Sequence, residues 1–341
     1  MPQEVALAAG AAVVSLCSTS DETIDEAEKD LPRNLCPLIK SSYGFGKTDK
    51  CPYFYFSDLV IGETTCDGKK KMYEYMADFK PVYVMQLPNT PNGESAMALW
   101  RSEIVKLRDL ISDRFHHQIT EDDLRKAIKL KNQERQALVG FYRIGQMNPP
   151  ALSGQEILKV VYGSTFKFDK QELVSELKAI TAQVKEDYAQ GKRLESRPRI
   201  LITGCPIGGA AEKMVKAIED NGGWVVGFEN CSGAKANELM VDEHKNVYDA
   251  LAEKYLAIGC SCMSPNPNRT QLIGEMVEQY QVDGVIDVIL QACHTYAVES
   301  LAIKRYVREQ HNIPYMAIET DYSQSDIGQL NTRAAAFIEM L

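Results

Sequence analysis

Short apolar segments that alternate with amphipathic ones are the feature that most constrains how this chain folds. From residue 200 onward, the pattern predicts strand 200–203, helix 210–221, strand 224–229, strand 284–289, a helix after Cys293 and strand 315–319. Strands that alternate with helices run parallel, because each helix carries the chain back across one face of the sheet. The pattern therefore predicts an α/β domain with a doubly wound parallel sheet.

The beginning of the chain carries a similar pattern, with strands expected at 11–17, 58–62 and 81–87 and a helix at 67–79. From about 95 to 190 the sequence instead predicts long amphipathic helices, for which Thr120 and Ser153 are candidate N-caps. We expect three parts: a first α/β domain over 1–95, a helical insert over 96–196, and a second α/β domain over 197–341.

A faint internal duplication relates the two α/β parts. The strand D-L-V-I-G-E-T-T runs into Cys66, and the strand D-G-V-I-D-V-I-L-Q-A runs into Cys293; each is followed by a helix and a proline-led strand. The order helix, glycine, strand, cysteine also occurs twice, ending at Cys17 and at Cys231. This repetition predicts two Rossmann-like domains with a cleft between them.

The overall charge excludes some classes of partner. The chain has 38 Lys and Arg against 47 Asp and Glu, a formal net charge of −9, so it offers no basic face for nucleic acid. No apolar run reaches the roughly 20 residues of a membrane-spanning helix. The opening Met-Pro-Gln-Glu lacks the segments of an export signal. We expect a cytoplasmic protein with no membrane contact.

Nine cysteines are the main clue to function. In a reducing compartment they are not expected to form disulfides, and an odd count also argues against a disulfide framework. Cys17 and Cys51 are expected to pack as small apolar residues. Apart from Cys293, the others stand beside turn residues, which suits a backbone that wraps a cofactor: Cys36, Cys66, Cys205, Cys231, Cys260 and Cys262.

The position of these cysteines along the predicted elements favours metal binding. Ligands of parallel sheets gather beyond the carboxyl ends of the strands, where Cys66 and Cys293 lie. Both also precede a helix, whose N–H groups and dipole favour a thiolate. Lys69–Lys71 either add positive charge beside an anionic cluster or form a solvated helix surface. Pattern alone leaves metal or Fe–S binding and inert packing about equally supported.

Zinc is the competing metal. The chain has no C-x-x-C pair, and its five histidines form no i,i+4 pair on a helix. Local zinc sites usually show one of these spacings. Cysteines that are scattered over two domains fit a cluster held in a cleft better than a zinc knuckle.

Three motifs make a family resemblance recognisable. They are N-L-C-P-L-I-K-S-S-Y-G around Cys36, D-L-V-I-G-E-T-T-C-D-G-K-K-K around Cys66 and I-L-Q-A-C-H-T-Y-A-V-E-S around Cys293. They resemble the 2-hydroxyacyl-CoA dehydratase component family, which also includes benzoyl-CoA reductase subunits and the double-cubane cluster proteins. The resemblance covers the whole chain and is strongest to the double-cubane and enterobacterial branches. Family members begin with a further helix and strand, so this chain looks short at its N-terminus.

The resemblance implies a cofactor, a ligand set and partners. Carried over by motif, Cys36, Cys66 and Cys293 would hold one 4Fe–4S cluster with an open iron. In the double-cubane branch, further cysteines hold a sulfide-bridged 8Fe–9S cluster, for which the candidates here are Cys205, Cys231, Cys260 and Cys262. The implied partners are an ATP-hydrolysing Fe–S activator protein and a second subunit, either identical or homologous. The implied substrate is a 2-hydroxyacyl-CoA or another small molecule.

Two other functions remain open at this point. The same cysteines would serve a non-catalytic Fe–S electron-transfer protein. Gly204, Gly208 and Gly209 follow a strand and precede a helix, with Glu229 at the end of the next strand, which is close to a dinucleotide-binding unit. However, G-C-P-I-G-G lacks the G-x-G-x-x-G spacing, and no G-x-x-x-x-G-K-[ST] loop occurs anywhere in the chain. The sequence singles out no catalytic acid or base.

Overall fold

The computed structural model describes residues 1–16 and 18–341. The first stretch of the described chain consists of short elements: α1 (Gln3–Ala8), α2 (Ile24–Ala27), α3 (Pro37–Lys47), α4 (Pro52–Tyr55), β1 (Val60–Glu63), α5 (Asp67–Met76) and β2 (Val82–Met85). Strands β1 and β2 pair in parallel, from Val60 opposite Val82 to Glu63 opposite Met85. The connecting helix α5 packs against both strands, so this unit is a small βαβ motif.

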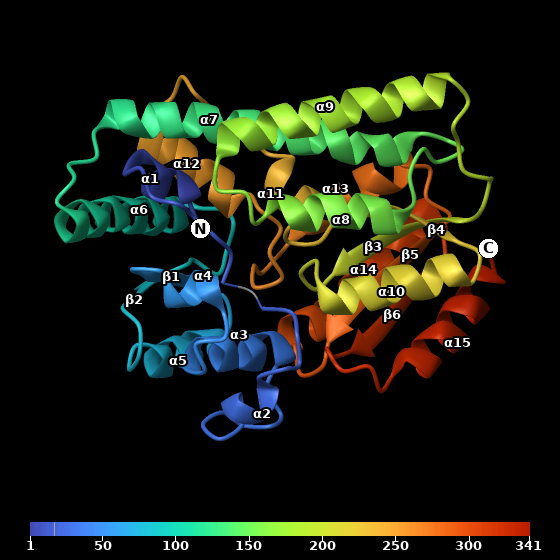
Figure 1. The fold of residues 1–341 in the computed structure, drawn as a ribbon, viewed down its shortest axis with the longest axis horizontal. Coiled ribbons are helices and arrows are strands. Elements are labelled where there is room, and N and C mark those ends of the chain that lie inside the picture. Colours follow the sequence, from blue (N-terminus) through green and yellow to red (C-terminus); the bar gives the residue numbers. More distant parts are fainter. Residues whose placement is uncertain (17) are drawn as a thin grey trace.

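The middle stretch is helical, as expected: α6 (Glu94–Phe115), α7 (Glu121–Tyr142), the 3₁₀ turn η1 (Arg143–Gln146), α8 (Gly154–Ser164) and α9 (Lys170–Ala189). Thr120 and Ser153 each complete a capping box at the start of α7 and α8, as their sequence predicts. Helices α7 and α9 pack side by side and lie across the top of the molecule in Figure 1.

The last stretch returns to alternating strands and helices: β3 (Arg199–Gly204), α10 (Gly209–Asp220), β4 (Trp224–Phe228), α11 (Ala234–Asn237), α12 (Val247–Leu256), α13 (Pro267–Gln279), β5 (Gly284–Leu290), α14 (His294–His311), β6 (Tyr315–Thr320) and α15 (Ile327–Ile338). The strands form one parallel sheet in the order β4-β3-β5-β6. This sheet confirms the predicted parallel α/β fold of the last stretch.

Both faces of the four-stranded sheet are covered. Every residue of the central strands β3 and β5 is buried. Ile200 and Ile202 pack in the core shared with α10 and α15, whereas Leu201 packs in a separate core with α13 and α14. Successive residues of a strand point to opposite faces, so one buried strand supplies two cores. The result is a doubly wound sheet.

The first stretch differs from its prediction. Residues 11–16, expected to be a buried strand, form no regular structure; Ala12 and Ser15 are exposed. Cys17 lies outside the described residues. Within the described chain the first sheet therefore has two strands, and it is not doubly wound. The physical reason is that residues 11–16 line a large cavity and do not pair with β1 or β2.

One part of the predicted duplication, the strand-cysteine-helix-strand unit, is visible in the structure; the other part, a strand ending at Cys17, is not, because residues 11–16 form no strand. The units β1–α5–β2 and β5–α14–β6 both consist of two parallel strands joined by a helix, and Cys66 and Cys293 are the N-caps of the two helices. The hydrophobic cores join the three stretches: one contains Met72, Phe141 and Ile202. The division at 95 and 196 stays a prediction.

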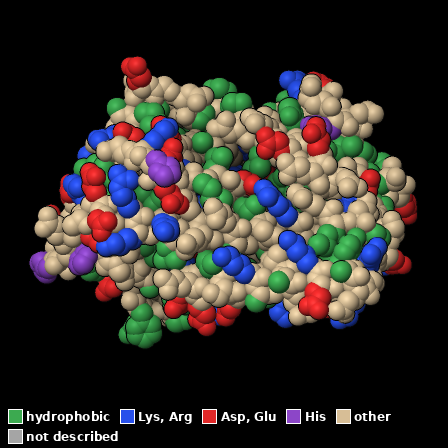
Figure 2. All heavy atoms as spheres, turned by 90° about the horizontal axis from the view of Figure 1, so that it is seen from above, with side chains coloured by type: hydrophobic (Ala, Val, Ile, Leu, Met, Phe, Trp, Pro, Cys, Tyr) green, Lys and Arg blue, Asp and Glu red, His purple; other side chains and the backbone are tan. Residues whose placement is uncertain are grey.

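Surface charge and helix composition can be compared with the expectation that the chain binds neither nucleic acid nor a membrane. On the face seen in Figure 2, Lys and Arg side chains lie among Asp and Glu, with no patch of a single sign. None of the helices in residues 1–16 and 18–341 combines the length and the apolarity that are needed to cross a membrane.

Candidate metal centre

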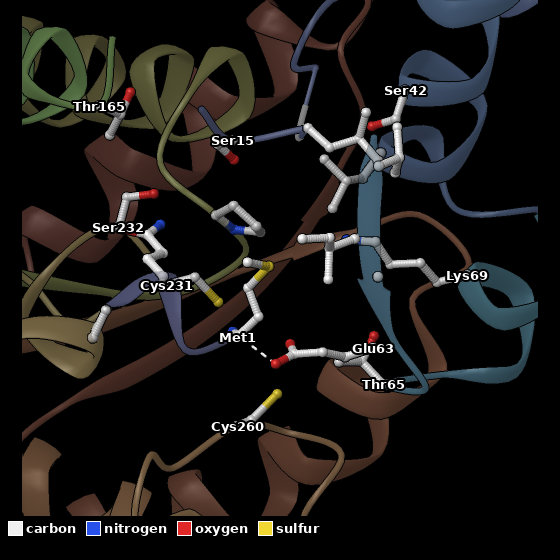
Figure 3. Close-up of a pocket in the computed structure, with 18 of the residues that line it drawn as sticks. Met1, Ser15, Ser42, Glu63, Thr65, Lys69, Thr165, Cys231, Ser232 and Cys260 are labelled. Carbon is white, nitrogen blue, oxygen red and sulfur yellow. Dashed lines mark ion pairs between the residues drawn. The ribbon is translucent and has the colours of Figure 1, made fainter. Parts of the chain in front are cut away.

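The cysteines of the described chain line one large cavity. Its volume is about 2600 Å³, and residues from all three stretches line it. Every cysteine in the described chain contributes to the lining, and none of them is in a disulfide: Cys36, Cys51, Cys66, Cys205, Cys231, Cys260, Cys262 and Cys293. Figure 3 shows Cys231 and Cys260 entering the cavity opposite Lys69 and Ser42. The structure thus brings together all seven predicted ligands, including those far apart in sequence.

The three motif cysteines occupy equivalent local positions. Cys36, Cys66 and Cys293 are the N-caps of α3, α5 and α14, respectively. Pro37 starts α3, which explains the helix boundary after Cys36, because proline is favoured in the first turn. The Sγ of Cys66 accepts a hydrogen bond from the backbone N–H of Lys69 at 3.4 Å. Three helix N-termini, each with partial positive charge, therefore face one cavity.

The Cys36 and Cys293 thiols interact directly. A hydrogen bond from the Cys36 thiol lowers the pKa of Cys293 to about 6, and the same bond together with burial raises the pKa of Cys36. Burial raises the pKa of Cys66, against the opposing effect of the Lys69 N–H. Cys293 is therefore the most readily ionised of the three motif cysteines.

Cys260 and Cys262 form a second sulfur pair. The Cys262 thiol donates to Cys260 Sγ at 3.4 Å, which lowers the pKa of Cys260 to about 6 and raises that of Cys262. Both residues lie in the turn between α12 and α13. The sequence G-C-S-C could have suggested this pairing, because two residues separated by one other can place their side chains together in a tight turn.

Cys205 and Cys231 lie between these two pairs. Cys205 follows β3 directly and is 1% exposed; burial raises its pKa, and the charges of Asp287, Cys293 and Cys231 add to that effect. Cys231 follows β4, and its Sγ is 3.4 Å from the hydroxyl of Tyr296. Burial also raises the pKa of Cys231, although the nearby Lys235 opposes this. Cys205 is thus close enough to Cys293 and Cys231 to interact with them electrostatically, and Cys231 is close enough to Cys260.

Sequence reasoning missed two buried cations near Cys231, namely Arg269 and Lys235, and the ion pairs that they form. Arg269 is fully buried and contacts the carboxylates of Glu229, Asp287 and Glu299. Lys235, 2% exposed, pairs with Glu229 at 3.0 Å. Nothing local to these residues reveals their partners, which are distant in sequence. A weak signal existed in Tyr296, which stands one helical turn after the motif residue Cys293.

The lysines after Cys66 divide between the two predicted roles. Lys69 and Lys70 line the cavity, and Lys70 also pairs with Asp67 at 3.0 Å. Lys71 pairs with Glu74 at 2.9 Å on the solvent side and does not line the cavity. Lys69 and Lys70 therefore place positive charge beside the cavity, whereas Lys71 belongs to a solvated helix surface.

The glycines of G-C-P-I-G-G are explained by close contacts within the chain. A Cβ on Gly204 would lie 2.2 Å from the carbonyl oxygen of Val288 in the adjacent strand. A Cβ on Gly208 or Gly209 would collide with Thr19, at 2.5 Å in each case. The chain's own residues thus occupy the space in which a dinucleotide pyrophosphate would approach this loop.

The donor set suits an Fe–S cluster better than a single ion. Among the described residues, no three His, Cys, Asp or Glu side chains converge closely enough to hold one metal ion. A cubane is wider, because each cysteine binds a different iron, and thiolates are its usual ligands. Eight reduced cysteines around one large cavity fit this chemistry.

Fold and site together define a class of protein: an α/β protein whose cysteines meet in one cavity, three of them at helix N-termini. A family model described as "2-hydroxyglutaryl-CoA dehydratase, D-component" matches residues 1–341, and the chain belongs to that family. This confirms the resemblance inferred from the three motifs.

Individual relatives agree with this membership. The chain is 73% identical over 341 residues to the "Putative dehydratase subunit YjiM" of Escherichia coli (strain K12), covering 100% of this chain and 89% of that protein. It is 24% identical to the (R)-phenyllactyl-CoA dehydratase beta subunit of Clostridium sporogenes, over 100% of this chain and 89% of the relative. One of the benzoyl-CoA reductase subunits of Thauera aromatica is 18% identical, over 100% of this chain and 88% of the relative.

Proposed function

We propose that this chain is an iron–sulfur subunit that accepts low-potential electrons from an ATP-dependent activator. It would use them to dehydrate a 2-hydroxyacyl-CoA or to reduce another small molecule. The observation that carries the proposal is the convergence of Cys36, Cys66 and Cys293 at three helix N-termini on one cavity. The dehydratase and reductase subunits among the relatives support the reaction class.

The cysteines would divide into two ligand groups. Cys36, Cys66 and Cys293 would hold a 4Fe–4S cluster. Cys205, Cys231, Cys260 and Cys262 are the candidates for extending it to a sulfide-bridged 8Fe–9S cluster. When bound, such a cluster supplies single-electron transfer at low potential and an open iron as a Lewis acid.

The protein's own residues prepare the site for such a group. The N–H groups at the starts of α3, α5 and α14 stabilise negative charge on sulfur, with Lys69 and Lys70 adding positive charge at the cavity wall. Near the motif cysteines, Ser261 donates to the hydroxyl of Thr295, which lies 3.6 Å from Cys293 Sγ. These two hydroxyls are uncharged, so they would give a substrate polar contacts without adding charge to the site.

The proposal includes partner proteins. Three relatives are named as beta subunits of dehydratases, which supports association with an identical or homologous subunit. The chain has no phosphate-binding G-x-x-x-x-G-K-[ST] loop, which supports ATP hydrolysis by a separate activator.

Iron and acid-labile sulfide per chain, measured on anaerobically purified protein with EPR spectra after dithionite, test the cofactor. About eight irons per chain support the larger cluster, and about four support the smaller one. Folded protein without iron would refute the cluster, and dinucleotide binding by the iron-free protein would then be measured. Cys293→Ser should lower the iron content, whereas Cys51→Ser, at a cysteine in the same cavity outside the proposed ligand set, should not.

Turnover separates an enzyme from an electron-transfer protein. The cluster-loaded protein is mixed with an activator, ATP and candidate 2-hydroxyacyl-CoA thioesters, and the unsaturated product is quantified. Reduction of the cluster without any product from the tested substrates would favour the non-catalytic alternative.

A further inference from the structure

Cys231 differs from the other candidate ligands because it is tied to a buried tyrosine and a buried lysine. Its Sγ lies 3.4 Å from the hydroxyl of Tyr296 in the first turn of α14. The same hydroxyl lies 3.1 Å from Nζ of Lys235 in α11. Tyr296 is 6% exposed and Lys235 is 2% exposed, so water does not compete freely for these contacts.

The chemistry of the groups fixes the direction of these hydrogen bonds. A lysine ammonium only donates, so the Tyr296 oxygen accepts from Lys235. The proton of the hydroxyl must then be donated elsewhere, and Cys231 Sγ is the acceptor within reach. Cys231 is therefore set as a hydrogen-bond acceptor. By contrast, Cys36 and Cys262 donate to a neighbouring sulfur.

The surrounding charges hold this arrangement in place. Lys235 pairs with Glu229, which also accepts a hydrogen bond from Thr203 at 2.5 Å. Arg269 stacks on the Tyr296 ring, with its guanidinium carbon 4.7 Å from the ring centre. Burying a lysine is costly unless it is paired, so the ion pair with Glu229 is what compensates the burial of Lys235. Tyr296 thus contacts two cations: Lys235 at its hydroxyl and Arg269 at its ring.

We propose that Lys235 and Tyr296 are positioning residues that select Cys231 as a sulfur ligand: in the cluster-loaded protein Lys235 donates to the Tyr296 hydroxyl, and Tyr296 donates to Cys231 Sγ. This rests on the proposed function and narrows the choice among Cys205, Cys231, Cys260 and Cys262. A hydrogen bond to a ligand sulfur and a nearby positive charge both favour the reduced, more negative cluster. The pair should therefore raise the reduction potential of the cluster that Cys231 binds.

Four variants test the proposal, one of which, Cys231→Ser, removes the sulfur itself. Tyr296→Phe removes the donor hydroxyl and keeps the ring, and Lys235→Met removes the charge and keeps the chain length. Tyr315→Phe is the matched control, because Tyr315 is also buried but its hydroxyl donates to a carboxylate, that of Asp287, at 2.7 Å. Each protein is assayed for iron and sulfide, for folding by circular dichroism, and for potential by EPR-monitored redox titration. Electron–nuclear double resonance in H₂O and D₂O detects exchangeable protons near the reduced cluster.

The expected result is a shift to more negative potential in Tyr296→Phe and Lys235→Met, with the Tyr315→Phe potential unchanged. Tyr296→Phe should also lose one exchangeable proton coupling. Cys231→Ser should lower the iron content.

Two results would overturn the proposal. In one, Tyr296→Phe keeps the wild-type iron, potential and proton couplings. In the other, Cys231→Ser keeps the wild-type iron and sulfide. Both leave the proposed function standing, because the wild type still carries a cluster. A wild type that is folded but free of iron would instead refute the proposed function itself.

Discussion

Glu4 offers a quantitative test of the structure that does not depend on any cofactor. It is fully buried in α1; its Oε1 lies 2.5 Å from the Arg135 guanidinium, and its Oε2 accepts from Tyr255 at 2.8 Å. Burial raises the pKa of this carboxyl, but the charges of Arg135, Lys254 and Lys131 outweigh it and lower the pKa from 4.5 to about 2.

The lowered pKa predicts how stability depends on pH. The pKa of Glu4 is lower in the folded protein than in the unfolded chain, so the ionised carboxylate favours the folded state. This contribution to the free energy of unfolding is fully present above pH 4.5. It is lost as the pH falls toward 2. The difference in pKa corresponds to about 3 kcal/mol, or about 1.4 kcal/mol for each pH unit within that window. Other carboxylates titrate in the same range, so the effect has to be isolated with a variant.

The measurement is urea unfolding of wild type and Glu4→Gln from pH 7 down to pH 3. At neutral pH we expect Glu4→Gln to be less stable by about 3 kcal/mol. Below pH 4.5 the two proteins should converge, because only the wild type loses the Glu4 contribution. Glu26→Gln, at an exposed ion pair with Lys29, is the control and should behave as wild type. Parallel pH profiles for wild type and Glu4→Gln would refute the argument.

Two further predictions concern the backbone. Gly204→Ala should destabilise the protein by about 2 kcal/mol or more in chemical denaturation, because φ is +103° and the new Cβ would lie 2.2 Å from the Val288 oxygen; Gly163→Ala, which meets nothing within 4 Å in α8, should not destabilise it. Thr120→Ala should cost about 1 kcal/mol by removing the capping box of α7, and an unchanged unfolding midpoint would contradict that role.

The sequence predicted the last stretch better than the first, for a physical reason. The apolar runs at β3 and β5 are buried on both faces, so their composition and their structure agree. Residues 11–16 have a similarly apolar composition but no paired strand, and they line a cavity. Composition alone does not distinguish these two cases. What decides between them is whether the segment pairs with a strand in the assembled fold, as β3 and β5 do, or lines a cavity instead.

The sequence was enough to select the cysteines of the candidate site, but not the residues that surround them. Cys66 and Cys293 could be assigned to helix N-termini because strand, cysteine and helix follow one another directly in the sequence. The contact between Cys231, Lys235 and Tyr296 joins α11 to α14, and no local pattern encodes it. The burial of Arg269 among three carboxylates is likewise a property of the assembled fold.

The contact between Cys36 and Cys293 has a topological consequence. These residues stand near opposite ends of the chain, and their thiols share a hydrogen bond. Any group that binds both sulfurs ties the chain into a ring that contains the entire helical stretch α6–α9. A cross-link restricts the unfolded chain more as the loop that it closes grows longer, at a rate that is only logarithmic. A bound cluster would therefore stabilise the folded protein by restricting the unfolded chain between Cys36 and Cys293. Loss of the cluster would then destabilise regions far from the metal.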